Sequence, residues 1–283
     1  MKKIVLWLLT IMVVAFLAGF VVLQVSGSNV IDGMFGKKTQ INEEKSVGLQ
    51  GVNTVSIKTV NPSIKITPTD ENEIRVHFYG SVNGNRTDNK LETSVSGDTL
   101  SIEVTHKKPS FAIFDLASDE NLKLDIYLPR KYSGNLQGST VSGNLNISGL
   151  RVADLVASSN SGDVILNGLK AAKADITNTS GMIDTNGLVA DTTISNVSGE
   201  IKGSFKELAS SINIKSTSGD ADLALPQAAG FKVNFQTVSG DFSSNFPEGP
   251  GSSDKKNVSF TNGDGRTNIT VSSVAGSLKV RKN

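Results

Sequence analysis

Polar and hydrophobic positions alternate along most of the chain after residue 50. In the segment from Lys173 to Thr179, for example, Ala174 and Ile176 alternate with Asp175 and Thr177. Alternation with a period of two residues is the mark of a β-strand with one buried face. β-Branched residues are frequent in such stretches, and Gly, Asn, Asp and Ser separate them. The pattern therefore predicts a series of short strands joined by tight turns.

The predicted turns recur at a nearly constant interval. A Ser-Gly pair marks each interval, and the glycines are 19, 19, 18, 20 and 21 residues apart. The six glycines are Gly143, Gly162, Gly181, Gly199, Gly219 and Gly240. A repeat of about this length is typical of a solenoid, in which each coil stacks on the one before. We interpret the six glycines as structural corners, where the backbone needs positive φ or a close approach.

Aligning the coils on these glycines places similar residues in columns. The column two residues after the glycine is apolar and consists of Leu145, Val164, Ile183, Ile201, Ala221 and Phe242. The column three residues before it is polar and consists of Thr140, Ser159, Asn178, Asn196, Ser216 and Thr237. Parallel strands stack about 4.8 Å apart, with like side chain over like. The fold class that we predict is all-β, a parallel β-solenoid with a polar, hydrogen-bonded ladder at one corner.

The N-terminal segment has a different pattern. After Lys2 and Lys3 comes an uncharged segment whose apolar core, Ile4 to Val25, is 22 residues long. This core is long enough to span a bilayer at about 1.5 Å per residue, whereas the core of a signal peptide usually has about 7–15 residues. We predict one transmembrane helix within residues 1–25, with cleavage near Ala18 or Ser26 as the alternative. Lys2 and Lys3 favour a cytoplasmic N-terminus, which predicts a single-pass protein of the cell membrane with an extracytoplasmic C-terminal domain.

Four further segments can be separated by composition and regularity. Residues 26–51 are rich in Gly, Ser, Asn, Lys and Glu and are predicted to be a linker. Residues 52–130 alternate less regularly, which predicts irregular first coils or a β cap, because an open solenoid end exposes strand edges. Residues 131–245 form the regular coils of about 19 residues. Residues 246–283 are predicted to be closing strands, with Ala275-Gly276-Ser277 as a last, degenerate corner.

Composition and motifs limit the chemistry that we expect. The net charge is +1, so no broad field attracts nucleic acid, and we predict no nucleic-acid partner. The chain has no cysteine, which excludes disulfides and thiol chemistry. His77 and His106 have no second His or Cys nearby, so we expect neither a zinc site nor a Ser/His/Asp triad. No phosphate-binding motif is present, and we predict no cofactor.

A pair of carboxylates is the one enzymatic hypothesis that the repeats offer. If Asp220 and Asp241 lay on consecutive coils, they would be neighbours about 5 Å apart, as in retaining glycosidases. The same pair is a weak candidate for a metal site. Aspartate is also an ordinary corner residue, however. The residues directly after the six glycines are Asn144, Asp163, Met182, Glu200, Asp220 and Asp241, so Met182 interrupts this column. We therefore predict no catalytic residues and a protein that is not an enzyme.

At this point the residues resemble a known family. Leu124-Asp125-Ile126-Tyr127-Leu128-Pro129, then Leu136, then repeated Thr/Val-Ser-Gly-Asp/Asn units are similar to the bacterial putative-adhesin β-strand-repeat family. The resemblance extends from about Val52 to the C-terminus. With its short start and single span, the chain is most similar to the LiaG-type members of Gram-positive bacteria. The resemblance implies a right-handed β-solenoid on the outer face of the membrane, an association with the cell-envelope stress response, and no catalytic residues.

We therefore predict a non-enzymatic, membrane-anchored scaffold or interaction module in the cell-envelope stress response. Its expected partners are the cytoplasmic membrane, through the N-terminal helix, and either envelope-stress membrane proteins or cell-wall polymer. The first alternative is a cell-surface adhesin or wall-polymer-binding module, which exposed aromatic clusters would favour, although the only tryptophan is Trp7 in the apolar segment. A carbohydrate-active enzyme is the lesser alternative, and it would need a groove lined by carboxylates from several coils.

Overall fold

The computed structural model describes residues 38–83, 89–106, 121–247 and 256–283. The regular elements in these ranges are β-strands, which form two sheets of 11 strands each, called sheet A and sheet B. The described ranges contain no helix that is long and apolar enough to cross a membrane. The predicted transmembrane helix within residues 1–25 lies outside them.

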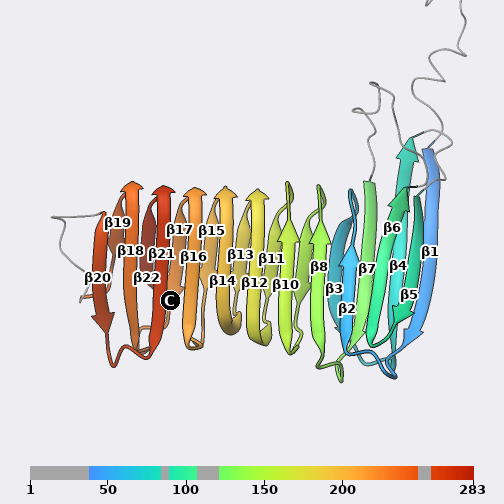
Figure 1. Ribbon diagram of the computed structural model, residues 1–283, viewed down its shortest axis with the longest axis horizontal. Helices are drawn as coiled ribbons and strands as arrows, with labels where there is room; N and C mark the ends of the chain where they lie inside the picture. Colours follow the sequence, from blue (N-terminus) through green and yellow to red (C-terminus); the bar gives the residue numbers. More distant parts are fainter. Residues whose placement is uncertain (1–37, 84–88, 107–120, 248–255) are drawn as a thin grey trace, which may run out of the picture.

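Five coils in the middle of the molecule follow one another in sequence order (Figure 1). In each coil a strand of sheet B leads through the Ser-Gly corner into a strand of sheet A. The pairs are β8 (Asn135–Thr140) with β9 (Leu145–Ser148), β10 (Asp154–Ser159) with β11 (Val164–Asn167), β12 (Lys170–Ser180) with β13 (Ile183–Asn186), β14 (Val189–Ser198) with β15 (Ile201–Ser204), and β16 (Ser211–Ser218) with β17 (Ala221–Leu225). Each strand is parallel to its neighbours, and the register keeps like residues together, as in Ile176 opposite Ile194. The predicted all-β architecture of stacked parallel strands is confirmed.

The N-terminal end is built from coils that are not in sequence order. The strands are β1 (Lys38–Gly48), β2 (Thr54–Lys58), β3 (Ser63–Thr69), β4 (Glu73–Asn83), β5 (Asn89–Ser96), β6 (Thr99–His106) and β7 (Asn121–Pro129). The coil of β2 and β3 lies between the coil of β8 and β9 and the coil of β6 and β7, so blue strands separate green ones in Figure 1. Beyond them, β4 and β1 extend sheet A and β5 extends sheet B, all through antiparallel pairs. The antiparallel strands form the cap of this end.

Strand β1 corrects the prediction that residues 26–51 are a linker. Residues 38–48 pair with β4 over their whole length. The sequence resembles a linker because Ile41, at 9% exposure, is the only buried side chain of β1. Charged residues on such an edge strand discourage further pairing. One of them, Glu43, also connects the two sheets, because its Oε2 accepts a hydrogen bond of 3.2 Å from the backbone N–H of Leu91 in β5.

The C-terminal end is interleaved in a similar way. Its strands are β18 (Phe231–Ser239), β19 (Phe242–Ser244), β20 (Asn257–Asn262), β21 (Thr267–Ala275) and β22 (Leu278–Lys282). The last coil, β21 with β22, inserts between the coil of β16 and β17 and the coil of β18 and β19. Ile214 and Phe235, each five residues before its corner glycine, would be neighbours if the coils stacked in sequence order. In the structure Val271 lies between them and is opposite both. The repeat could not reveal this order, because each apolar column accepts any β-branched or aromatic residue.

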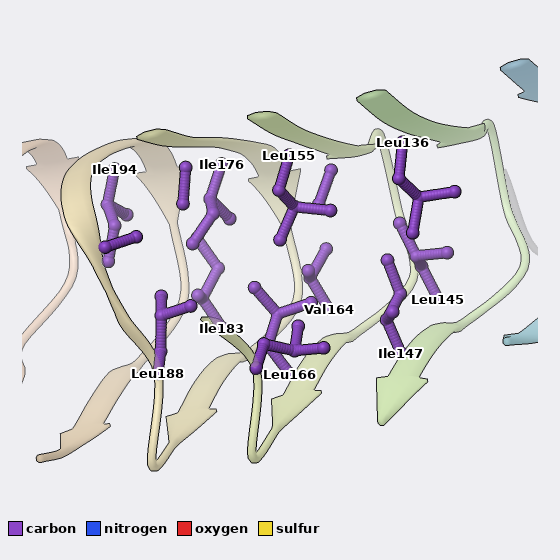
Figure 2. Packing of buried hydrophobic residues seen from close by; sticks show 14 of the residues in the cluster. Leu136, Leu145, Ile147, Leu155, Val164, Leu166, Ile176, Ile183, Leu188 and Ile194 are labelled. Atoms are coloured by element: carbon purple, nitrogen blue, oxygen red, sulfur yellow. The ribbon is translucent and has the colours of Figure 1, made fainter. Parts of the chain in front are cut away.

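The core fills the narrow space between the two sheets. Inward side chains of sheet B, such as Leu136 and Leu155, face inward side chains of sheet A, such as Leu145 and Val164 (Figure 2). At the C-terminal end, aromatic rings with centroids 5.0 to 6.1 Å apart close the core, and they belong to Phe231, Phe235, Phe242, Phe246 and Phe260. Antiparallel edge strands therefore close both ends, with β1, β4 and β5 at one end and β20, paired with β18, at the other, where the phenylalanine cluster is added.

Glycine occupies both corners of the coils that end in β9, β11 and β13, and the two corners need it for different reasons. At the Ser-Gly corner the backbones of successive coils approach closely, and a Cβ on Gly162 would lie 2.0 Å from the carbonyl oxygen of Gly143. At the opposite corner Gly168 has a φ of 60° with no heavy atom within 4 Å of the added Cβ. The first corner therefore excludes a side chain by contact, and the second favours glycine through its left-handed backbone.

Candidate functional site

The polar column that follows the Ser-Gly corners connects one coil to the next. The side-chain Oδ1 of Asn144 accepts a hydrogen bond of 3.0 Å from the backbone N–H of Asp163 in the adjacent coil. Asp163 in turn accepts one of 2.8 Å from the backbone N–H of Met182. These side chains satisfy backbone donors that the turn leaves without a strand partner. Their role is structural.

Asp220 and Asp241 do not form the predicted pair of neighbouring carboxylates. The inserted coil of β21 and β22 places Ser277 between them: Asp220 Oδ1 accepts a hydrogen bond of 2.7 Å from Ser277 N, and Ser277 Oγ accepts one of 3.2 Å from Asp241 N. Two coil spacings separate the aspartates by about 10 Å. Within the described ranges, no group of three or more His, Cys, Asp or Glu residues could hold a metal ion.

The polar ladder on the other side of the corner is buried, as predicted. Ser159 Oγ accepts a hydrogen bond of 2.9 Å from the backbone N–H of Gly162. Asn178 Nδ2 donates one of 3.1 Å to the carbonyl oxygen of the same glycine. Less than a tenth of the surface of each ladder residue is exposed, in Thr140, Ser159, Asn178, Asn196, Ser216 and Thr237. Five of the six ladder residues close the corner of the core with hydrogen bonds, whereas the Oγ of Ser216 is buried without a hydrogen-bond partner among the described residues.

The two histidines lie on different sheets. His77 belongs to β4 in sheet A, and His106 is the last residue of β6 in sheet B. The His77 ring stacks on Tyr79 with 4.4 Å between centroids, and its Nε2 is 2.7 Å from Asn42 Oδ1. The contacts of His77 are therefore those of a surface residue within a sheet.

His77 belongs to a half-buried aromatic cluster that the sequence analysis missed. Tyr79 donates a hydrogen bond of 3.2 Å to Asp125 Oδ2, and the Arg75 guanidinium lies 4.4 Å from the centre of the Tyr127 ring. Partial burial and, next, the charge of Asp125 raise the pKa of Tyr79 above its usual value. Alternation along β4 and β7 could have revealed the cluster. Because its rings contact other side chains of the same cluster, it stabilises the antiparallel cap through cross-strand pairs.

The outer face of sheet A carries charges of alternating sign. One outward column along the stack consists of Asn146, Ile165, Asp184, Lys202, Asp222, Lys279 and Ser243. Asp222 forms ion pairs with Arg281 at 2.8 Å and with Lys279 at 3.8 Å. Lys202 pairs with Glu200 at 2.9 Å, and this hydrogen bond raises the pKa of the lysine. The face is a set of hydrated ion pairs.

The outward residues of sheet B form four columns across seven coils. The column farthest from the Ser-Gly corner is charged and includes Asp154, Lys173, Asp191 and Lys232. The three columns nearer to that corner are almost uncharged. The first column is Gln137, Val156, Asp175, Thr193, Asn213, Thr270 and Asn234. The second column is Ser139, Ser158, Thr177, Ser195, Lys215, Ser272 and Gln236. The third column, beside the Ser-Gly corner, is Val141, Asn160, Thr179, Val197, Thr217, Val274 and Val238. Asp175 and Lys215 are the charged members of these columns.

Exposed apolar side chains are concentrated in the third column. Of the seven large hydrophobic side chains that are exposed in the described ranges, five belong to this column and to its continuation on the coil of β2 and β3: Val60, Val141, Val197, Val238 and Val274. Val238 is the most exposed, at 69%. Exposed valines scattered at random would need no explanation, but a column of them marks a surface suited to contact.

A shallow groove of about 200 Å³ lies between the second and third columns. It crosses β12, β14 and β16, so its long direction follows the stack of coils. One wall consists of Thr177, Ser195 and Lys215, the other of Thr179, Val197 and Thr217, and the bottom of Asn178, Asn196 and Ser216. The groove is the candidate functional site, and the same alternation that predicted the core could have located it, once the outward residues of each coil were compared.

The chain has only distant similarity to solved structures, with TM-scores below 0.5 for those named below. No curated protein matches the chain. Solved structures that resemble it include a putative cell adhesion protein from Clostridium sporogenes (12% identity, 87% of this chain and 100% of that chain, TM-score 0.42). They also include a putative adhesin from Bacteroides fragilis (15% identity, 87% and 98%, TM-score 0.41) and a putative lipid binding protein from Parabacteroides distasonis (15% identity, 86% and 96%, TM-score 0.36).

One protein family matches nearly the whole described chain. The sequence profile of this family, described as Toastrack DUF4097, matches residues 52–281. That range includes the strands from β2 to β21 and nearly all of β22. The chain therefore belongs to the Toastrack DUF4097 family.

Proposed function

We propose that this protein is a non-enzymatic interaction module of LiaG type in the cell-envelope stress response. Residues 1–25 anchor it in the cytoplasmic membrane, and the solenoid stands on the outer side. The N-terminal strand β1 begins at Lys38, so about a dozen residues connect the predicted anchor to the cap. At roughly 3.3 Å per residue, such a connection is short enough to keep the N-terminal end of the solenoid near the membrane.

The main support for a non-enzymatic role is that the polar residues at the corners hydrogen-bond to the backbone and so stabilise the fold. Asp163 and Asp220 cap backbone donors of the neighbouring coil. Ser159 and Asn178 are buried and hydrogen-bonded to the corner backbone. Catalytic acids and bases need instead to converge on one accessible point. The surface that remains for contact is the nearly uncharged part of sheet B beside the Ser-Gly corner, which favours a binding role.

Two kinds of partner suit an interaction module at this place, an envelope-stress membrane protein or the cell-wall polymer. Exposed aromatic residues would favour either partner, but protein interfaces are also enriched in Met and Arg and depleted in Ser. None of the enriched types occurs in the three columns of sheet B beside the Ser-Gly corner, where Ser, Thr, Asn and Val predominate. The polymer-binding alternative thus has a specific surface in its support.

The proposal can be tested by comparing the full chain with a chain that lacks the residues before Ser26. Both forms would be expressed, cross-linked in intact bacteria and recovered from the envelope. We expect the full chain to fractionate with the cytoplasmic membrane and to be accessible from outside, and its loss to alter the response to envelope-damaging antibiotics. A full chain recovered from the cytosol, or an unchanged response, would contradict the proposal.

A further inference from the structure

We infer that the outer face of sheet B binds an extended, uncharged polysaccharide that lies in the groove along the stack of coils. The inference deepens the interaction role proposed above and rests on it for the place where the polymer is met.

The low charge around the groove is the first feature that supports this inference. In the three columns beside the Ser-Gly corner, Asp175 and Lys215 offset each other. The charged column with Lys173 and Asp191 lies outside the groove. A surface without net charge gives an anionic polymer no favourable field, and it has few charges to strip of water when a neutral ligand binds. An uncharged polymer is therefore matched to the groove beside the Ser-Gly corner.

The second argument is shape. The walls of the groove are residues two positions apart on each strand, such as Thr177 and Thr179 on β12. Such residues are separated by about 7 Å along a strand, which admits a single thin chain and not the surface of a globular protein. The groove repeats once per coil, about every 4.8 Å. A linear polymer with a unit of similar length can therefore present the same groups to each coil in turn.

The third argument is the chemistry of the two walls. Thr177 and Ser195 on one wall, and Thr179 and Thr217 on the other, carry hydroxyl groups that both donate and accept hydrogen bonds. Sugar hydroxyl and acetamido groups need partners of this kind. Val197 adds an exposed apolar contact, at 48% exposure, that suits the C–H face of a pyranose ring. The valine column extends this contact beyond the groove in both directions.

A binding experiment with the full chain in detergent micelles tests the inference. The probe is a soluble chito-oligosaccharide, a linear neutral oligomer of N-acetylglucosamine, and poly(glycerol phosphate) is the anionic counter-probe. We expect calorimetry to detect binding of the neutral oligomer, with an affinity that changes little between low and high salt. Binding of the anionic polymer alone, or of neither probe, would overturn the inference.

Matched variants assign the binding to one face. The double variant Thr179→Lys with Val197→Lys should weaken saccharide binding by about tenfold, because it places two hydrated cations in the groove. Asn186→Lys, on the outer face of sheet A in the same coil as Thr179, should change the affinity by less than about twofold. Thermal unfolding checks that each variant is folded. If the double variant does not fold, Thr179→Ala adds no charge and should weaken binding by about threefold.

Three results would contradict the site. An equal loss of binding in Asn186→Lys would remove the distinction between the faces. Unchanged binding in the folded double variant would move the site elsewhere. A dimer of the wild type that the double variant dissociates, detected by sedimentation, would identify a second copy of this chain as the occupant. Cytosolic recovery of the full chain would instead contradict the proposed envelope role while leaving saccharide binding intact, so the two proposals fail separately.

Discussion

The two outer faces of the solenoid are built on the same coils but from different residues. On sheet A the successive strands β13, β15 and β17 present Asp184, Lys202 and Asp222, whose signs alternate. On sheet B the strands of the same coils carry charges such as Lys173 and Asp191 away from the Ser-Gly corner, and mainly hydroxyl groups with Val197 beside it. Exposed ion pairs stay hydrated and contribute little to stability, whereas uncharged groups are easier to strip of water. A solenoid can therefore keep a hydrated, charged face on one sheet and an uncharged strip for contact on the other without changing its core.

The largest effect is expected where both faces depend on the same core. Ile194 is 1% exposed and lies between Ile176 and Ile214 in the inward column of sheet B. Ile194→Asp would bury a charge without a partner and should lower the free energy of unfolding by at least about 4 kcal/mol. Urea unfolding followed by circular dichroism measures the loss. The outward neighbour Thr193→Asp is the control, and equal stability of the two variants would contradict the assignment of faces.

A smaller effect is expected at the corner that joins the two faces. Gly162→Ala places a Cβ 2.0 Å from the Gly143 carbonyl oxygen, so the coils must separate locally. We expect a loss of about 3 kcal/mol in the free energy of unfolding. In Gly168→Ala, at the opposite corner, the added Cβ has no heavy atom within 4 Å. This variant should lower the free energy of unfolding by only about 1 kcal/mol, because alanine must adopt a left-handed φ. The reverse order of these two losses would show that φ, and not close approach, explains the Ser-Gly corner.

On the outer face of sheet A, a single charge should have a small and salt-dependent effect. Asp222→Asn removes the ion pairs with Arg281 and Lys279. Because Asp222 is partly exposed, we expect the free energy of unfolding to fall by about 0.5 kcal/mol at low salt, and by less as salt is added. Saccharide affinity should not change. A reduced affinity in this variant would extend the contact surface to sheet A.

On the outer face of sheet B, the smallest effect on stability should accompany a clear effect on binding. Ser195 is half-buried on one wall of the groove, and no described core contact depends on its hydroxyl. Ser195→Ala should leave the free energy of unfolding within about 0.5 kcal/mol of the wild type. Saccharide affinity should fall by about threefold, because one hydrogen-bonding group is lost. Titration calorimetry and urea unfolding on the same preparation separate the two effects, and a loss of stability with unchanged affinity would assign Ser195 to the fold.

Much of the fold could be predicted because its signals are local. The repeated glycines and the alternation around Ile176 locate the corners and the buried columns without any knowledge of which coil is adjacent. The order of the coils at the ends could not be predicted, because Val271 and Phe235 are equally suitable above Ile214. Strand β1 was missed because an edge strand with one buried residue, Ile41, lacks the alternation of a half-buried one.

The candidate site was only partly accessible from the sequence. The corner aspartates suggested an active site because aspartate is a common catalytic residue. The distance between Asp220 and Asp241, however, depends on an inserted coil that the repeat does not reveal. The groove can be recognised only when the outward residues of neighbouring coils are compared. Val197 and Thr179 are unremarkable singly, and they form a surface only when the register places them beside each other.

The most direct test of the central claim asks which face is covered in the living cell. Because the chain has no cysteine, Thr179→Cys on sheet B and Asn186→Cys on sheet A each introduce a single thiol. In the purified protein, both thiols should react rapidly with a maleimide that does not cross membranes. In intact cells we predict that Asn186→Cys still reacts rapidly while Thr179→Cys is protected. Equal reaction of both thiols in cells would contradict the contact face, and no reaction of either before lysis would contradict the extracytoplasmic location.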